Sequence, residues 1–210
     1  MTQTTARTDR SIVILCADDY GMSAGVSEGI LELAALKRLS ATSAIVTLDR
    51  WPEDARRLLA IRDRIAIGLH INLTLGAPLG PMPTLAPDGR LPTLSSLLVR
   101  ALAGRVDREE IAAEVTRQLA RFEKELGFAA DHIDGHQHVH ALPGIRDGVL
   151  AALGARFTGR RPLVRSPADS PSRIRKHSSA VSKALLIALL SGGLGGAARA
   201  QGFAVKSPGK

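Results

Sequence analysis

The sequence predicts an α/β protein in which parallel strands alternate with helices. Short apolar runs, such as residues 11–17 (SIVILCA) and 65–69, alternate with segments of helical periodicity, such as residues 24–37. This alternation is typical of a parallel sheet, either open or closed as a barrel. In both architectures ligands bind at the carboxyl ends of the strands, so polar residues that follow a strand are the first site candidates.

Length and composition fit a globular protein with an aliphatic core. The chain has 210 residues, of which 45% are hydrophobic and only 3% aromatic. We expect a flexible N-terminal segment at residues 1–10 and a single domain at residues 11–210. The one cysteine, Cys16, excludes an internal disulfide and fits a reducing compartment. We expect Cys16 to be a small core residue and not a nucleophile.

Charge and hydropathy limit the partners. The formal charge is +8, and a basic face can attract nucleic acid or acidic substrates. The scarcity of aromatic residues argues against a surface for single-stranded nucleic acid. The N-terminus lacks a signal-peptide pattern, and the apolar stretch 184–198 is interrupted by Ser191 and four glycines. We expect a cytoplasmic protein with no nucleic-acid partner and no membrane span, and a homodimer stays open.

The expected elements follow in chain order. Strands are predicted at residues 11–17, 42–48, 65–69, 130–134 and, as a short fifth strand, 163–165. Helices are predicted at residues 24–37, 52–61, 144–156 and 174–190, with glycines at 192–196 breaking the last one, and two more after a five-proline loop at 76–92. The second of those two has clear boundary signals: Asp107 as N-cap, Glu110 in a capping box, and Gly127 as the stop.

The segment 131–140 (DHIDGHQHVH) contains four of the six histidines in the chain. As a continuous strand it would turn all four imidazoles to one face, although Asp134-Gly135 is also a turn signal. Imidazole and carboxylate groups form the ligand set of divalent metals, and the alternative is a solvated, histidine-rich turn. So many titratable groups would repel one another on protonation unless something organises them, which favours the metal site.

Polar residues at three strand ends are expected to meet. Asp18 and Asp19 follow the first strand, His70 follows the third, and Asp134 and His136 follow the fourth. In a parallel sheet these ends lie at one edge. Two simpler interpretations compete: the aspartate pair could cap a helix, and a strand-end histidine could hydrogen-bond to backbone.

Three segments carry a family resemblance. Residues 17–21 (ADDYG), 68–74 (GLHINLT) and 132–140 (HIDGHQHVH) resemble, in order and spacing, the YdjC-like carbohydrate deacetylases, which include the chitooligosaccharide deacetylases. The resemblance extends from Ile12 to about Arg165. It implies an irregular (β/α) barrel and a carbohydrate substrate.

The resemblance also implies site residues. One divalent metal, usually magnesium and in related enzymes zinc, would be held by Asp19, His70 and His136, with Asp18 as the catalytic base. Family members usually continue for several βα units, including a His-Pro-Gly-like segment, whereas this chain ends at Lys210. An incomplete barrel, a truncated reading frame and a cleft open on one side are the three interpretations of this difference.

Deacetylation needs a water nucleophile, a polarised carbonyl and a proton for the leaving amine. A bound metal can supply the first two, and a carboxylate that is not a metal ligand can take the proton of the water. We assign His138 as the second catalytic group. Either His138 or His140 could donate the proton, support a ligand or lie on the surface, and Asp134 could orient a ligand histidine. Two alternatives remain: a metal phosphodiesterase or nuclease, and a truncated homologue that binds metal without turnover.

Overall fold

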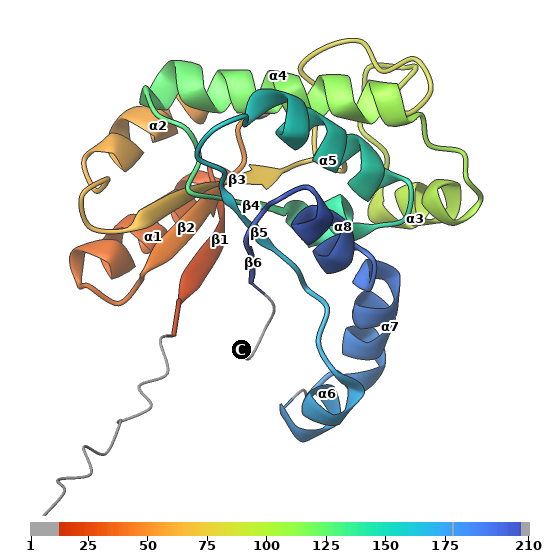
Figure 1. Cartoon of the computed structure of the whole chain (residues 1–210). Coiled ribbons are helices and arrows are strands. Elements are labelled where there is room, and N and C mark those ends of the chain that lie inside the picture. Colours follow the sequence, from red (N-terminus) through yellow and green to blue (C-terminus); the bar gives the residue numbers. More distant parts are fainter. Residues whose placement is uncertain (1–12, 178, 207–210) are drawn as a thin grey trace, which may run out of the picture.

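The computed structural model describes residues 13–177 and 179–206, and the expected flexible segment at residues 1–10 lies outside this part of the chain. Strands and helices alternate along most of it (Figure 1). The elements are β1 Cys16–Tyr20, α1 Ala24–Ala35, β2 Ala41–Ala44, α2 Trp51–Leu59, β3 Ala66–Ile71, α3 Leu94–Leu102, α4 Arg108–Leu126, β4 His132–Gly135, the 3-10 helix η1 His136–Ala141, α5 Ile145–Arg156, β5 Leu163–Arg165, α6 Pro171–His177, α7 Val181–Ser191, α8 Leu194–Ala200 and β6 Val205–Lys206.

The six strands form one parallel sheet in sequence order, from β1 to β6. This confirms the predicted α/β class. Each strand pairs with the strand before it in the sequence, the order found in (β/α) barrels. Among the described residues β1 and β6 are the two edges, so these strands do not close a barrel.

The sheet is strongly curved. Four strand spacings separate β1 from β5, which is about 19 Å across a flat sheet. Nevertheless, Nη1 of Arg165 on β5 lies 2.6 Å from Oδ1 of Asp18 on β1. A flat sheet would keep these groups apart, so the strands curl toward one another and enclose a concave inner face.

The outer face of the sheet is apolar and lies against helices. Ile67, Leu69 and Ile133 are fully buried there, and α4 and α5 pack together above the sheet (Figure 1). Trp51 at the start of α2 stacks on Phe122 of α4, with ring centroids 6.2 Å apart. Branched aliphatic side chains on a buried strand face are the usual core of such a fold.

The boundaries of α4 follow its sequence signals, with one correction. Asp107 accepts hydrogen bonds from the backbone of Glu109 and Glu110, and Gly127 ends the helix with φ +76°. The predicted capping box is wrong in its second half, because Oε1 of Glu110 accepts from the backbone N–H of Thr84, at 2.9 Å. Glu110 therefore anchors the proline-rich loop and not the start of its own helix.

The first strand differs from its prediction. It begins at Cys16 and continues through Asp18, Asp19 and Tyr20, and the preceding residues Val13–Leu15 are largely exposed. The expectation of a strand at 11–17 buried on both faces was wrong in the described part of that range. Among the described residues no second layer covers Val13–Leu15, and these three residues line a hollow instead.

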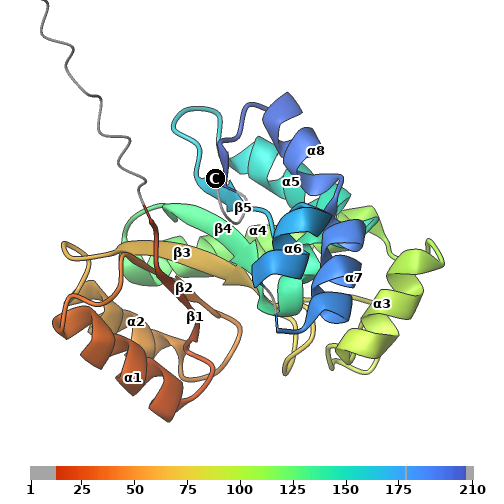
Figure 2. The ribbon, with the colours of Figure 1, turned by 90° about the horizontal axis from the view of Figure 1, so that it is seen from below.

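The segment after β5 also differs from its prediction. The helix expected at 174–190 is two helices, α6 and α7, and the glycines at 195 and 196 lie inside α8. The range Val181–Ala200 has the length and composition of a membrane span, with mean hydropathy 1.5 and 17% of its most apolar window buried, which for a single segment is weak evidence. Figure 2 shows α6 and α7 beside the end of the sheet toward which β3 runs.

Candidate functional site

The concave face of the sheet lines a hollow of about 970 Å³. Side chains two residues apart on a strand share a face, so each strand contributes alternate residues to the floor of this hollow. The apolar residues Ile174 of α6 and Ile187 of α7 lie on its rim. Among the polar side chains that line it are Cys16, Asp18, His70, His132, Asp134 and Arg165.

A β-bulge directs two adjacent aspartates to the same side of β1. Ala17 pairs with Thr42 and Tyr20 with Ala44, so Asp18 and Asp19 together stand opposite the single residue Ser43. Asp19 has φ +67°, in the left-handed region. In a regular strand adjacent side chains point to opposite faces, and a bulge removes that restriction. Helix α1 is capped by Ser23, so the aspartate pair is not its cap.

Asp19, His70 and His136 lie together at the carboxyl ends of β1, β3 and β4. One ligand atom from each lies within 4.8 Å of the other two. Oδ1 of Asp19 is 2.7 Å from Nδ1 of His136 and 3.1 Å from Nε2 of His70. Hydrogen bonds from the two imidazoles, His136 first, hold the pKa of Asp19 well below its usual range. One carboxylate and two imidazoles are a suitable donor set for a divalent cation.

Asp134 orients His70. Nδ1 of His70 donates to Oδ1 of Asp134 at 2.6 Å, and Oγ of Ser43 lies 3.1 Å from the same nitrogen. Burial alone would lower the pKa of His70, but hydrogen bonds to Asp134 and Asp19 raise it to about 9. With Nδ1 committed to a carboxylate, Nε2 is the nitrogen available to a metal, an arrangement common for metal-bound histidines. The simpler interpretation, in which His70 would hydrogen-bond to the backbone, is therefore wrong, because its Nδ1 bonds to the side chain of Asp134.

Arg165, at the end of β5, links the two carboxylates of the floor. Its Nη1 donates to Oδ1 of Asp18 at 2.6 Å and to Oδ2 of Asp134. The second oxygen of the Asp134 carboxylate is thus also occupied, and the hydrogen bond from His70 and the charge of Arg165 lower the pKa of Asp134 against the effect of burial. Arg165 and Ser43 are site residues that the sequence interpretation missed. Arg165 ends a predicted strand, so the strand-end rule could have identified it.

Beyond Gly135 the histidine cluster is not a strand. Residues 136–141 form η1, in which Gln137 and His138 have φ of 54° and 62°. Two consecutive left-handed residues cost about 1 kcal/mol or more each, and such strain is concentrated at functional sites. His138 lines the hollow, where desolvation lowers its pKa. The turn signal at Asp134-Gly135 is therefore confirmed, and the alternative of a continuous strand with one shared histidine face is wrong.

His140 supports Arg165 from behind. Its Nε2 donates to the backbone carbonyl of Arg165 at 2.8 Å, and the side chain is almost completely buried. Burial lowers the pKa of His140 to about 4, so the neutral imidazole is the form that the fold requires. Of the roles considered for His140, this contact fits support of a site residue.

We expect His140 to make the free energy of unfolding fall as the pH is lowered. The unfolded chain takes up a proton near pH 6.5 and the folded chain near pH 4, so stability is complete above 6.5 and falls between these values. At about 1.4 kcal/mol per pKa unit, the loss reaches roughly 3 kcal/mol by pH 4. Urea unfolding of wild type and His140→Gln at pH 7 and pH 4 should show a smaller acid loss in the variant. Equal losses would contradict this assignment.

Cys16 is not the small core residue that the sequence suggested. It lines the hollow from β1, with its Sγ 3.7 Å from Nε2 of His132. Burial raises its pKa to about 12 against the opposing charge of Arg165, so at neutral pH it is a thiol. A protonated thiol is a poor nucleophile, and the absence of a nucleophilic role for Cys16 stays a prediction.

Two curated proteins illustrate what this chain is similar to. A human carbohydrate deacetylase is 37% identical over 164 residues, which are 74% of this chain and 50% of the relative. The chitooligosaccharide deacetylase of Serratia marcescens is 39% identical over 135 residues, 64% of this chain and 52% of the relative. The chain therefore spans about half the length of these curated relatives.

A solved structure shows a similar fold, and a family model identifies the family. A protein from Enterococcus faecalis V583, to which cellobiose-phosphate cleavage is ascribed, aligns with a TM-score of 0.62 and 25% identity over 85% of this chain and 64% of its own. The model for YdjC-like proteins matches residues 12–204, nearly the whole chain. On this match, and on the three motifs that meet at the hollow, the chain belongs to the YdjC-like protein family.

Proposed function

We propose that this protein is a metal-dependent hydrolase that removes the acetyl group from an N-acetylated sugar. The observation that carries the proposal is the convergence of Asp19, His70 and His136 beside a further carboxylate, Asp18. Relatives that are 37% and 39% identical to this chain are named carbohydrate deacetylase and chitooligosaccharide deacetylase. The hollow on the concave face has the volume expected of a small-molecule site.

The three proposed ligands fit a divalent cation. Asp19 would contribute an oxygen, and His70 and His136 would contribute one nitrogen each, which leaves coordination positions for water and substrate. A bound cation would supply Lewis-acid chemistry, by lowering the pKa of a water and stabilising the oxyanion that develops on the amide. Magnesium favours oxygen ligands and zinc accepts imidazole readily, so both ions belong in the test.

Asp18 is the proposed general base. It lies outside the set Asp19, His70 and His136, so its carboxylate can receive a proton from the attacking water. Arg165 Nη1 and, at 3.3 Å, Ser43 Oγ both donate to Oδ1 of Asp18 and hold the carboxylate toward the hollow. Oδ2 is then the atom proposed to take the proton.

His138 is the proposed proton donor to the leaving amine. Its side chain lines the same hollow as Asp18. The lowered pKa of His138 keeps the ring neutral at rest, so it would first take up the proton that Asp18 has removed from the attacking water and then give it to the leaving nitrogen. This order predicts that His138 acts after Asp18 in each turnover.

Acetate release tests the proposed function. The purified chain is incubated with N,N'-diacetylchitobiose and, in parallel, with a generic phosphodiester, in the presence of Mg²⁺ or Zn²⁺. We expect acetate release that chelation abolishes and added metal restores, with no phosphodiester cleavage. His136→Ala should lose both activity and one bound metal ion.

Two outcomes would overturn the proposal. Cleavage of the phosphodiester without acetate release would indicate a metal phosphodiesterase. Bound metal without turnover on either substrate, and with no rate change in His136→Ala, would indicate a homologue that binds metal only.

A further inference from the structure

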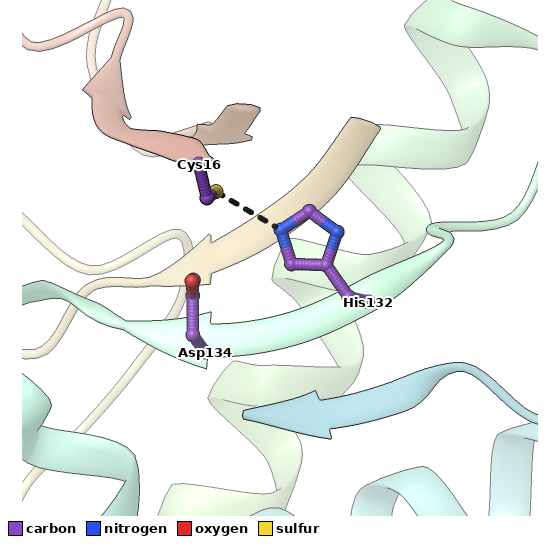
Figure 3. A group of neighbouring side chains, drawn as sticks. All are labelled: Cys16, His132 and Asp134. Atoms are coloured by element: carbon purple, nitrogen blue, oxygen red, sulfur yellow. Dashed lines mark hydrogen bonds between the residues drawn. The ribbon is translucent and has the colours of Figure 1, made fainter. Parts of the chain in front are cut away.

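A second group of metal-ligating side chains lies on the floor of the hollow. Cys16 projects from β1, and His132 and Asp134 project from β4, into the same space (Figure 3). One ligand atom from each lies within 4.8 Å of the other two. None of the three belongs to the set Asp19, His70 and His136, although Asp134 hydrogen-bonds to His70. Thiolate, imidazole and carboxylate together are typical ligands of zinc-like cations.

The sequence makes room for the histidine of this group. The ring of His132 lies directly over Gly68 of β3, where an added Cβ would be 2.4 Å from the ring atoms. Any other residue at position 68 would displace the imidazole from the sheet. With glycine there, the ring of His132 fits close to β3, the residue is only 4% exposed, and Nε2 lies 3.7 Å from Sγ of Cys16.

The same place already attracts positive charge. Nη1 of Arg165 lies 3.4 Å from Sγ of Cys16 while it pairs with Asp18 and Asp134. Two carboxylates and a polarisable sulfur therefore surround a single guanidinium. The side chain of Arg165 is 34% exposed, so a cation that took this position would not displace a fully buried group.

We propose that Cys16, His132 and Asp134 form a second cation site, for a thiophilic divalent ion of the zinc class, beside the Asp19–His70–His136 set. Binding forms one metal–sulfur bond, releases the thiol proton of Cys16 to solvent and replaces the guanidinium of Arg165 beside Asp134. The soft sulfur ligand discriminates against magnesium, which prefers oxygen ligands. The site stands on its own contacts and does not depend on the proposed deacetylation.

Cadmium is the probe for this site, because a Cd²⁺–thiolate bond gives a charge-transfer band in the ultraviolet and the chain has one cysteine. Titration of the metal-free chain should produce this band, saturating at one thiolate-bound ion per chain. Equilibrium dialysis should count two ions in total. Excess Mg²⁺ should leave the band unchanged.

Matched variants separate the two sites. Cys16→Ser should remove the band and one of the two ions, and His132→Gln should weaken the band-forming binding at least tenfold. His136→Ala should keep the band and lose the other ion. Circular dichroism of each variant checks that the fold is intact.

A ¹¹³Cd NMR spectrum of the wild-type chain tests the site without any substitution. Its result therefore does not depend on whether the variants fold. We expect a ¹¹³Cd resonance whose chemical shift corresponds to one sulfur ligand and one nitrogen ligand. The proposal is overturned by the absence of the band in wild type, or by equal binding in His132→Gln, which would mean that Cys16 binds alone. Failure of acetate release would leave the band and the ion count unchanged, so the two proposals fail separately.

Discussion

Asp18→Asn is expected to lower turnover by about 10²- to 10⁴-fold while leaving the bound metal unchanged. Asparagine keeps the shape of the side chain, and its amide oxygen can still accept from Arg165, at the atom that lies 2.6 Å from Nη1 in wild type. It cannot take a proton from water at neutral pH. Acetate release and elemental analysis of the same preparation measure the two quantities.

Asp169→Asn is the matched control for this experiment. Asp169 also lines the hollow, but its Oδ1 accepts from the backbone of Ser170 in the loop before α6. We expect this variant to retain both turnover and metal. If Asp18→Asn kept its full rate, the base would have to be another group. Loss of metal in Asp18→Asn would instead make Asp18 a ligand.

His70→Ala is expected to reduce metal affinity by 10- to 100-fold or more, and activity with it. The change removes one ligand and also leaves Oδ1 of the buried Asp134 without its hydrogen-bond donor. The unfolding midpoint should therefore fall as well. Isothermal titration with Zn²⁺ and thermal unfolding of the metal-free chain measure the two effects.

His136→Ala separates metal binding from stability. His136 is partly exposed and contacts the carboxylate of Asp19, itself 31% exposed, so its removal strands no fully buried charge. We expect a comparable loss of metal affinity with a smaller change in the unfolding midpoint. Full metal content in both variants would mean that the proposed ligand set is wrong.

The order of the strands and helices could be predicted because it depends on local sequence patterns. Alternating apolar runs and helical segments gave the parallel sheet, and the strand-end rule then brought Asp19, His70 and His136 to one place. The rule needs only strand order and direction. The same rule covers Arg165, which stands at the end of β5 but was not among the predicted site residues.

Other features depend on pairing and packing between distant segments. The bulge at Asp18 and Asp19 arises from the register of β1 on β2, which leaves no local signal. The exposure of Val13–Leu15 depends on what covers the edge of the sheet, and an apolar run is the same in either case. The contact between Cys16 and His132 requires the curvature of the whole sheet, because three strand spacings separate β1 from β4.

The two-against-one pairing of β1 makes the site sensitive to the number of residues as well as to their identity. Loss of either aspartate by deletion would restore strict alternation along β1. Only one carboxylate would then remain for two positions, one beside Arg165 and one beside His136, and it could not occupy both. A surface loop elsewhere could lose a residue without effect on the site. A deletion of one residue here would remove a proposed site carboxylate and leave the sheet intact.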